Sequence, residues 1–451
     1  MRRLRSTLVL LVVAVGLGAY VFFVERHRAP ASETEPNEQL FTFDADDIAE
    51  LHLTGTSATV TELHRTDGTW RVVSPIEANA DETAVSSITS SLASLEIRRV
   101  LDEGPVDLEP FGLVDPALDV GFKLADSETV AHVLIGEETP TGADRYAKLA
   151  DADRVFLIAG YLDTTFDKTT FDLRDKKILA VARDAIDGLR MTLGDRTIAL
   201  TKEGNDWRMT EPWNARADFS TVEGLVGRLD SGEMRSIESE DVDALDTYGL
   251  AEPHVTATLS VGSASATLRL GDEAPDGTRY ARDGSRDLVF TVEASLASDL
   301  ERDPSEYRQK DLFTFRSFNA TRLEIDHAEK TVVFEKTEAT ADGEEDQWRR
   351  IQPDVLDVDR IEMDDLLRKL STLRAESWVD SREDAGLGDT ERLMTIRARF
   401  GEDADEDRVT VWRSGEDTFG VHGDEPGVAK IDTQTLDDAL DALEAIQTED
   451  S

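Results

Sequence analysis

The sequence predicts an α+β protein in which an N-terminal transmembrane helix precedes three tandem repeats, each of mainly antiparallel strands with one amphipathic helix and a short closing helix. Three observations support this fold class. An uncharged apolar segment lies close to the N-terminus, a pattern of Trp, Pro and Asp recurs three times at fixed spacing, and apolar residues alternate with polar ones around that pattern. We therefore expect one membrane anchor and three copies of one folded unit.

The apolar segment has the length and flanks of a membrane-spanning helix. Residues 7–24 carry no charged side chain, and at about 1.5 Å per residue they approach the ~30 Å hydrocarbon core of a bilayer. Arg2, Arg3 and Arg5 precede the segment, which favours a cytoplasmic N-terminus. A cleaved signal peptide is the alternative, but its apolar core is usually shorter. We expect the segment to lie in the lipid bilayer of a bacterial inner membrane, with the remaining chain in the periplasm or another extracytoplasmic space.

A polar tether is expected between the anchor and the first repeat, because residues 25–40 contain two prolines and several glutamates and have no apolar periodicity. The predicted division is 1–24 for the cytoplasmic end and transmembrane helix, 25–40 for the tether, and 41–180, 181–313 and 314–451 for the three repeats.

The recurring pattern defines the repeat. A tryptophan stands five residues before a proline and eleven before an aspartate in each copy, and the members are Trp70, Pro75, Asp81, Trp207, Pro212, Asp218, Trp348, Pro353 and Asp359. Apolar residues at four, seven and eleven positions after each aspartate predict one buried helix stripe, with the aspartate as its N-cap. We interpret these landmarks as scaffold, with the strands ending at a core tryptophan and the proline stopping the strand.

A second set of landmarks follows the helix. Glycine precedes leucine at Gly112, Gly249 and Gly386, and a proline follows in the first two copies, whereas the third has Thr390. Copies one and two also end in similar four-residue segments at residues 173–176 and 307–310, which we call the closing runs. The third copy lacks the run because it is expected to finish in a helix, and we regard that copy as degenerate.

Period-two alternation predicts antiparallel strand pairs in every copy, joined by short turns that contain Gly and Asp. The expected pairs are 118–124 with 130–135, 255–261 with 266–270, and 393–400 with 409–412. Each unit is thus predicted to contain strands up to the Trp, one helix, a returning strand, a four-strand meander and the closing helix.

These motifs resemble the bacterial family called domain of unknown function 4340. The resemblance covers nearly everything from Phe41 onward and is strongest in the first two copies. It implies a protein tethered by one N-terminal helix, whose gene often lies beside those of an ABC transporter similar to the gliding-motility export system. The family has no assigned catalytic residue, so the resemblance implies none here.

Composition excludes several classes of function. The chain has 95 acidic and 49 basic residues, a formal charge of −46, and no cysteine. This negative charge repels the phosphate backbone of nucleic acid. The lack of cysteine thiols rules out disulfides and thiolate metal sites. Spread-out surface carboxylates are interpreted as a solubility feature. The seven histidines, His27, His52, His64, His132, His254, His327 and His422, form no metal-binding pair at local spacing.

One acidic run resembles the start of a calcium loop. Asp403, Asp405 and Asp407 have the required alternate spacing, but Arg408 stands where the sharp turn needs Gly. We interpret the run as a solvated hairpin turn and expect neither a metal nor a cofactor.

The sequence therefore favours a non-enzymatic accessory or scaffold protein, with ABC transporter permease or auxiliary subunits as possible partners. No hydrolase elbow or phosphate-binding loop is present in the sequence. Two alternatives stay open: a cell-envelope hydrolase that uses unrecognised carboxylates, and a ligand-binding module at the junctions between repeats.

Overall fold

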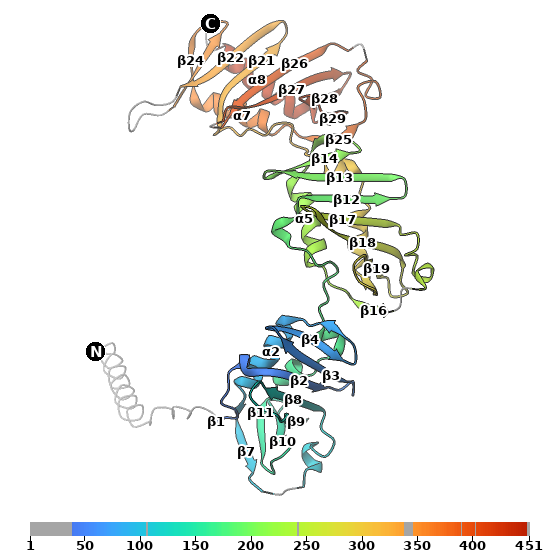
Figure 1. Ribbon diagram of the computed structural model, residues 1–451. Coiled ribbons are helices and arrows are strands. Elements are labelled where there is room, and N and C mark those ends of the chain that lie inside the picture. Colours follow the sequence, from blue (N-terminus) through green and yellow to red (C-terminus); the bar gives the residue numbers. More distant parts are fainter. Residues whose placement is uncertain are drawn as a thin grey trace, which may run out of the picture. The chain divides into compact units, whose positions relative to one another are not determined.

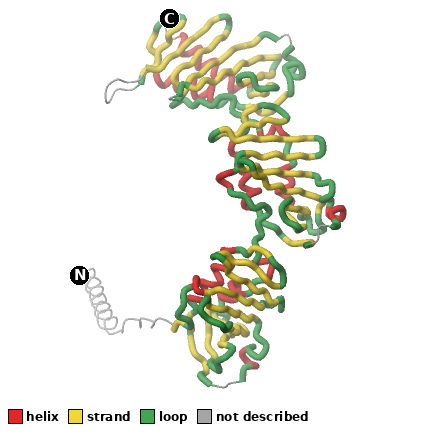
Figure 2. The backbone as a smooth tube through the Cα atoms, in the orientation of Figure 1, coloured by secondary structure: helices red, strands yellow, loops and turns green. Residues whose placement is uncertain are grey.

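The computed structural model describes residues 38–104, 107–240, 243–337, 346–388, 390–401 and 403–448. These residues contain three nine-stranded antiparallel sheets (Figure 1, Figure 2). The chain divides into two compact units: the first ends at Lys176 and holds the first sheet, and the second begins at Lys177 and holds the other two. The three sheets, which share one strand order, support the predicted repeat.

The first sheet has the strand order β5-β4-β3-β2-β8-β9-β10-β11-β7. Its strands are β2 (Ile48–Thr54), β3 (Val60–Thr66), β4 (Thr69–Ser74), β5 (Ala78–Asn79), β7 (Arg99–Asp102), β8 (Leu118–Leu124), β9 (Ala131–Glu138), β10 (Asp144–Leu149) and β11 (Val155–Ala159). Its helices are α2 (Glu82–Ala93), α3 (Leu162–Phe166) and α4 (Thr170–Leu173). A separate pair joins β1 (Glu38–Gln39) to β6 (Glu96–Ile97).

The second sheet repeats this order as β15-β14-β13-β12-β17-β18-β19-β20-β16. Its strands are β12 (Gly188–Leu193), β13 (Arg196–Glu203), β14 (Asp206–Glu211), β15 (Ala215–Arg216), β16 (Ser236–Ser239), β17 (Val255–Val261), β18 (Ala264–Glu273), β19 (Arg279–Asp283) and β20 (Val289–Val292). Its helices are α5 (Phe219–Ser231) and α6 (Ala294–Leu300), followed by the 3-10 turn η6 (Pro304–Tyr307).

The third sheet has the same order again, β24-β23-β22-β21-β26-β27-β28-β29-β25. Its strands are β21 (Ala320–His327), β22 (Lys330–Thr337), β23 (Gln347–Gln352), β24 (Leu356–Val358), β25 (Ala375–Val379), β26 (Arg392–Phe400), β27 (Asp405–Ser414), β28 (Asp417–His422) and β29 (Val428–Ile431). Its helices are α7 (Arg360–Ser371) and α8 (Thr433–Thr448).

One helix from the middle of each repeat covers one face of its sheet (Figure 2). The predicted stripe is buried in every copy: in α2 the residues Val85, Ile88 and Leu92 are fully enclosed, and α5 and α7 bury the equivalent positions. The facing strands alternate buried and exposed residues, as Trp70 and Val72 do around exposed Arg71. Period-two and period-3.6 patterns therefore meet in the core between each long helix and its sheet.

The structure corrects the predicted end of the strand that carries the tryptophan. Trp70, Trp207 and Trp348 are each the second residue of a strand, and the strand continues to the residue before the proline. The proline does stop the strand, because it has no N–H to donate to a neighbour. The pairing shifts register opposite this point in all three sheets.

The third repeat departs from the prediction at its closing helix. In place of a short helix it has the 16-residue α8, whose residues Leu436, Ala439, Leu443 and Ile446 are buried in the core with α7. Its sheet is otherwise complete, so the degeneracy inferred from the sequence concerns local motifs and leaves the strand order intact.

The predicted membrane anchor, residues 7–24, lies outside the described residues, as does the tether up to residue 37. Within the part of the chain that the structure describes, no helix is both long enough and apolar enough to span a bilayer.

The buried tryptophans should carry much of each repeat's stability. Trp207 is 2% exposed, so we expect Trp207→Ala to lower the free energy of unfolding by about 3–5 kcal/mol through lost burial and a residual cavity. Urea denaturation followed by circular dichroism measures the change. Phe318→Ala is the control, because Phe318 is 79% exposed and its removal should change stability by less than about 0.5 kcal/mol. Equal effects of the two substitutions would contradict the assignment of Trp207 to the core.

Candidate functional site at the seam between the second and third sheets

The sequence landmarks lie in three separate sets, one for each sheet. The tryptophans are buried, and each proline follows a cis peptide bond. The aspartates are helix N-caps: Asp81 accepts from the amides of Thr83 and Ala84, and the other two cap α5 and α7 in the same way. Each landmark tryptophan and aspartate belongs to the core or the helix cap of its own repeat. Their placement agrees with a scaffold role.

The glycine landmarks have a steric cause. Gly112, Gly249 and Gly386 have φ of 64°, 66° and 69°, a left-handed conformation that favours glycine. In the second repeat a further glycine, Gly271, lies directly against this turn, since a Cβ there would stand 2.0 Å from the carbonyl oxygen of Tyr248. Gly136 has the same relation to Phe111 in the first repeat. This close backbone contact leaves no room for a side chain, which explains why both copies have glycine near the ends of β9 and β18.

The closing runs are extended segments that pair with the edge of their own sheet. In the second repeat, the amide of Asp218 donates to the carbonyl of Tyr307 at 2.8 Å, and the amide of Gln309 donates to the carbonyl of Arg216 at 2.9 Å. Ala217 and Arg308 form the bridge between them. The run therefore covers the outer edge of β15, and the chain then passes directly into the third sheet.

This passage creates a seam of buried charge between the second and third sheets, which we define as Arg216, Arg308, Asp407, His422 and Glu425. The guanidinium of Arg308 lies 3.5 Å from the ring centre of Trp378, and its Nη2 donates to the carbonyl oxygen of Pro426 at 2.9 Å. Its side chain is 3% exposed, and Glu425, at 3.9 Å, is the nearest carboxylate in an ion pair with it. Stacking and ion pairing together hold this cation inside the protein.

Glu425 is the centre of the seam. Its Oε1 accepts from both the amide and the Nε of Arg216, at 3.0 and 2.9 Å, so a residue of the third sheet binds the edge strand of the second. His422 lies 3.8 Å from Glu425 through Nδ1 and 3.0 Å from Asp407 through Nε2. The amides of Thr314 and Phe315 in turn donate to Asp407. Strands β15, β27 and β28 are linked in one continuous network.

Burial and neighbouring charge act in opposite directions on these groups. Burial alone raises the pKa of Glu425, but the hydrogen bond with His422 and the positive charge of Arg216 lower it to about 2. Burial lowers the pKa of Arg308 to about 10 despite the attraction of Glu425, so Arg308 is still a cation at neutral pH. For His422, burial is outweighed by the hydrogen bonds to Asp407 and Glu425, and the pKa is raised. All these groups are therefore ionised near pH 6.

The acidic run of β27 was only partly interpreted correctly. Asp403 lies in an exposed turn, as predicted, but Asp407 is 3% exposed and belongs to the seam. The solvated-turn interpretation is wrong for Asp407, because alternate residues of a strand face opposite sides and this one faces inward. Among the described residues, no group of three or more His, Asp or Glu side chains is arranged to hold a metal ion.

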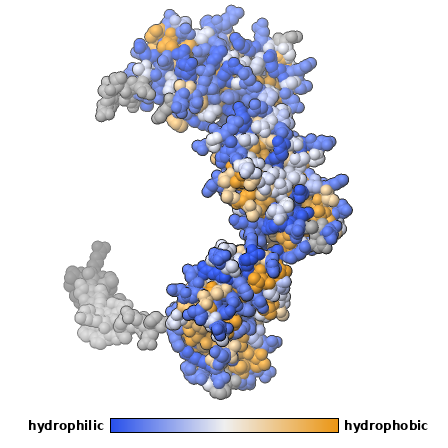
Figure 3. All heavy atoms as spheres, viewed as in Figure 1, coloured by the Kyte–Doolittle hydropathy of each residue, from blue (hydrophilic) through white to orange (hydrophobic). Residues whose placement is uncertain are grey.

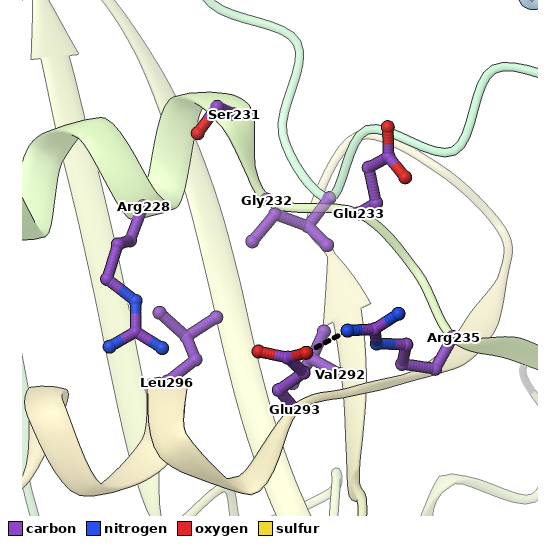
Figure 4. A pocket seen from close by; sticks show the side chains of 9 residues that line it. Arg228, Ser231, Gly232, Glu233, Arg235, Val292, Glu293 and Leu296 are labelled. Atoms are coloured by element: carbon purple, nitrogen blue, oxygen red, sulfur yellow. Dashed lines mark hydrogen bonds and ion pairs between the residues drawn. The ribbon is translucent and has the colours of Figure 1, made fainter. Parts of the chain in front are cut away.

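A shallow hollow of about 300 Å³ lies elsewhere in the second repeat, between the C-terminal end of α5 and the start of α6 (Figure 4). Arg228, Arg235 and Glu293 line it, and Arg235 and Glu293 pair with each other across it. The first repeat has a hollow of about 250 Å³ at the corresponding place, between α2 and α3. The recurrence shows that the space follows from packing a long helix beside a short one.

Comparison with known proteins places the chain in a family. The model for the family described as "Domain of unknown function (DUF4340)" matches residues 70–206 and 207–393, well over half of the chain. The chain therefore belongs to this family. Each match begins at a landmark tryptophan, inside β4 or β14. The segment that the family model matches therefore starts partway through one sheet and does not coincide with a single folded repeat.

Other comparisons add little. No curated protein matches the chain. Crystal structures of the DNA polymerase sliding clamp from Pseudomonas aeruginosa align at 10% identity, one with ligand (87% of this chain, 92% of that chain, TM-score 0.15) and one without (86% and 91%, TM-score 0.17). TM-scores this low support no conclusion about fold or function.

The sequence reasoning missed the seam. Arg308 was recognised only as part of a repeated closing run, His422 was named only among the scattered histidines, and Glu425 was not singled out. Arg216 and Arg308 each lie more than a hundred positions from Glu425, so local spacing carries no signal of these contacts. The available clue was Arg at the same place in both closing runs, at positions 174 and 308.

Loss of the central carboxylate should open the seam. We expect Glu425→Gln to lower the free energy of unfolding by about 3–5 kcal/mol, because it leaves the buried Arg308 and the half-buried Arg216 without their countercharge. Hydrogen exchange at Thr314 and Phe315 should speed up in the same variant. Glu383→Gln is the matched control, since Glu383 is exposed on the third repeat. An unchanged exchange rate in Glu425→Gln would show that the seam does not depend on this charge.

The seam should also respond to pH. Because the pKa of Glu425 falls from 4.5 to about 2 on folding, its contribution is complete above pH 4.5 and disappears as the pH falls towards 2. The pKa of His422 is raised above 6.5, so its contribution is complete below pH 6.5 and is lost at higher pH. In urea denaturation, the wild type should therefore exceed Glu425→Gln by more at pH 5.5 than at pH 3, and exceed His422→Asn by more at pH 5.5 than at pH 8. Differences that stay constant with pH would refute this linkage.

Proposed function

We propose that the protein is a non-enzymatic accessory or scaffold subunit, tethered to the inner membrane by residues 7–24 and exposed on the extracytoplasmic side, where it associates with an ABC-type transport complex. The observation that carries the scaffold role is the architecture: three nine-stranded sheets, two of them joined by a buried polar seam. The tether rests on the uncharged segment and on the preceding arginines.

The electrostatics favour a scaffold over a hydrolase. A carboxylate that acts as a general acid needs a raised pKa, usually from burial or a second carboxylate. Among the described Asp and Glu residues, every resolved shift is downward, as for Asp81, Asp218 and Asp407, and each has a hydrogen-bond donor or a cation as its cause. The alternative of a cell-envelope hydrolase receives no support from these carboxylates.

The seam likewise gives no support to a ligand site at the junction of the second and third repeats. A small-molecule site there would need an apolar cleft with a few convergent polar groups. The junction instead holds Arg308, which stacks on Trp378 and forms an ion pair with Glu425. A joint of this kind fixes two repeats against each other.

The association with an ABC transporter rests on the family resemblance. The sequence has no phosphate-binding loop that could hydrolyse ATP, so a transport role requires another chain to supply the energy. The acidic charge of −46 favours contact with basic surfaces over contact with nucleic acid.

Membrane tethering is tested with the full-length protein. We expect the wild type to stay in the membrane fraction after carbonate extraction, and Leu10→Arg with Val15→Arg to be released, because each arginine at a helix centre costs about 3 kcal/mol of insertion. Val15→Leu is the control and should stay in the membrane. Affinity purification from detergent-solubilised membranes should then enrich ABC permease or ATPase subunits. Release of the wild type would contradict the tether, and a purification without such subunits would contradict the transport association.

A further inference from the structure

Each nine-stranded sheet has a short edge strand just before its long helix: β5, β15 or β24. A closing run covers the outer side of this strand in two of the three sheets. In the first, the amide of Asp175 donates to the carbonyl of Asn79 at 2.8 Å, and the amide of Asp81 donates to the carbonyl of Leu173 at 2.9 Å. In the second, the corresponding bonds join Gln309 to Arg216 and Asp218 to Tyr307. An extended closing run thus acts as an additional short strand beside β5 and β15.

The same edge of the third sheet is uncovered. At the same distances from the landmark tryptophan, the third repeat has the carbonyl of Asp357 and the amide of Asp359 where the second has the paired carbonyl of Arg216 and amide of Asp218. Neither of these groups of the third repeat has a backbone partner among the described residues. Pairing of Trp348 with Val358 directs these groups away from β23. An unpaired edge of this kind is a template for another strand.

The cause lies in α8. Tyr307 and Ile446 each lie fifteen residues after the last strand of their sheet, and both are buried. The second repeat turns into its closing run at this point, whereas α8 remains helical to Thr448.

The surroundings of the edge indicate what would bind there. Val355 and Ile361 flank β24 and are 65% and 75% exposed, which is unusual for aliphatic residues so close together. Figure 3 shows hydrophobic surface at the end of the third sheet that carries β24. In the first repeat Lys176 lies 3.1 Å from the capping carboxylate of Asp81, but no Lys or Arg of the described chain pairs with the carboxylate of Asp359.

We propose that the β24 edge is a docking site for an extended segment of another protein, in which an aliphatic residue lies close to Lys or Arg. The segment pairs with the Asp357 carbonyl and the Asp359 amide, covers Val355 and Ile361, and places its cation beside Asp359. A second copy of this chain is a poorer occupant, because its closing runs are already paired and both chains carry a charge of −46. The proposal does not depend on the membrane anchor or on a transport complex.

The test uses a fluorescent peptide with the sequence of residues 170–178, Thr-Phe-Asp-Leu-Arg-Asp-Lys-Lys-Ile, and the full-length chain in detergent. We expect saturable binding by fluorescence anisotropy. A peptide with Pro in place of its Asp175 loses the amide that donates to the edge and should bind about fivefold more weakly. Val355→Ser with Ile361→Ser should weaken binding by a similar factor, and Asp359→Asn, which keeps the N-cap, should weaken it and reduce its salt dependence.

Location and specificity have their own controls. Phe318→Ser removes an equally exposed apolar residue of the third repeat and should leave binding unchanged. Because the chain has no cysteine, Ile361→Cys should form a disulfide with a cysteine-bearing peptide, whereas Val114→Cys, exposed on the first unit, should not. Equal binding of the two peptides, or equal effects of Phe318→Ser and the Val355 and Ile361 pair, would overturn the proposal. So would light scattering that shows a dimer abolished by the Val355 and Ile361 substitutions, since the occupant would then be a second copy.

Discussion

Burial of one face of a nine-stranded antiparallel sheet beneath the long helix from the middle of its repeat, with the closing helices packed in the same core, is the constraint on which the rest of this structure depends. The helix has to begin where the first hairpins end, so each repeat needs a strand stop and an N-cap a few residues apart. Pro212 and Asp218 meet that need in the second sheet, where the buried Trp207 donates a hydrogen bond to Glu223 of α5. The spacing of Trp, Pro and Asp is the same in every copy because the three residues together set how the strand ends and the helix packs on the sheet.

The joint between the second and third sheets depends on charged groups, whereas each core depends on apolar packing. The closing run of the second repeat leaves its core, covers the edge of β15 and then enters the third sheet. Arg308 and Glu425 form an ion pair at this joint, in which Arg308 stacks on Trp378 and Glu425 accepts a hydrogen bond from Arg216. Such a pair contributes little net stability compared with apolar packing, but it accepts only one geometry.

Most of the fold was predictable from the sequence, because strands and helices leave periodic signals within a few residues. The helix stripe at Val222, Leu225 and Leu229 and the β17–β18 pair both follow such signals. The exact end of the tryptophan strand was missed because a core residue does not mark a boundary. The seam was missed because Arg216 and Glu425 are 209 positions apart, and only the folded chain brings their charges together.

Three similar sheets in one chain create a hazard during folding, since an edge suited to one closing run resembles the edges suited to the others. Misassembly between neighbouring repeats is a common failure of such proteins. The bond from the Arg216 amide to Glu425 identifies the correct neighbour, because a wrongly paired repeat would bury a carboxylate without its donors. The seam therefore specifies that the third repeat packs against the edge strand of the second.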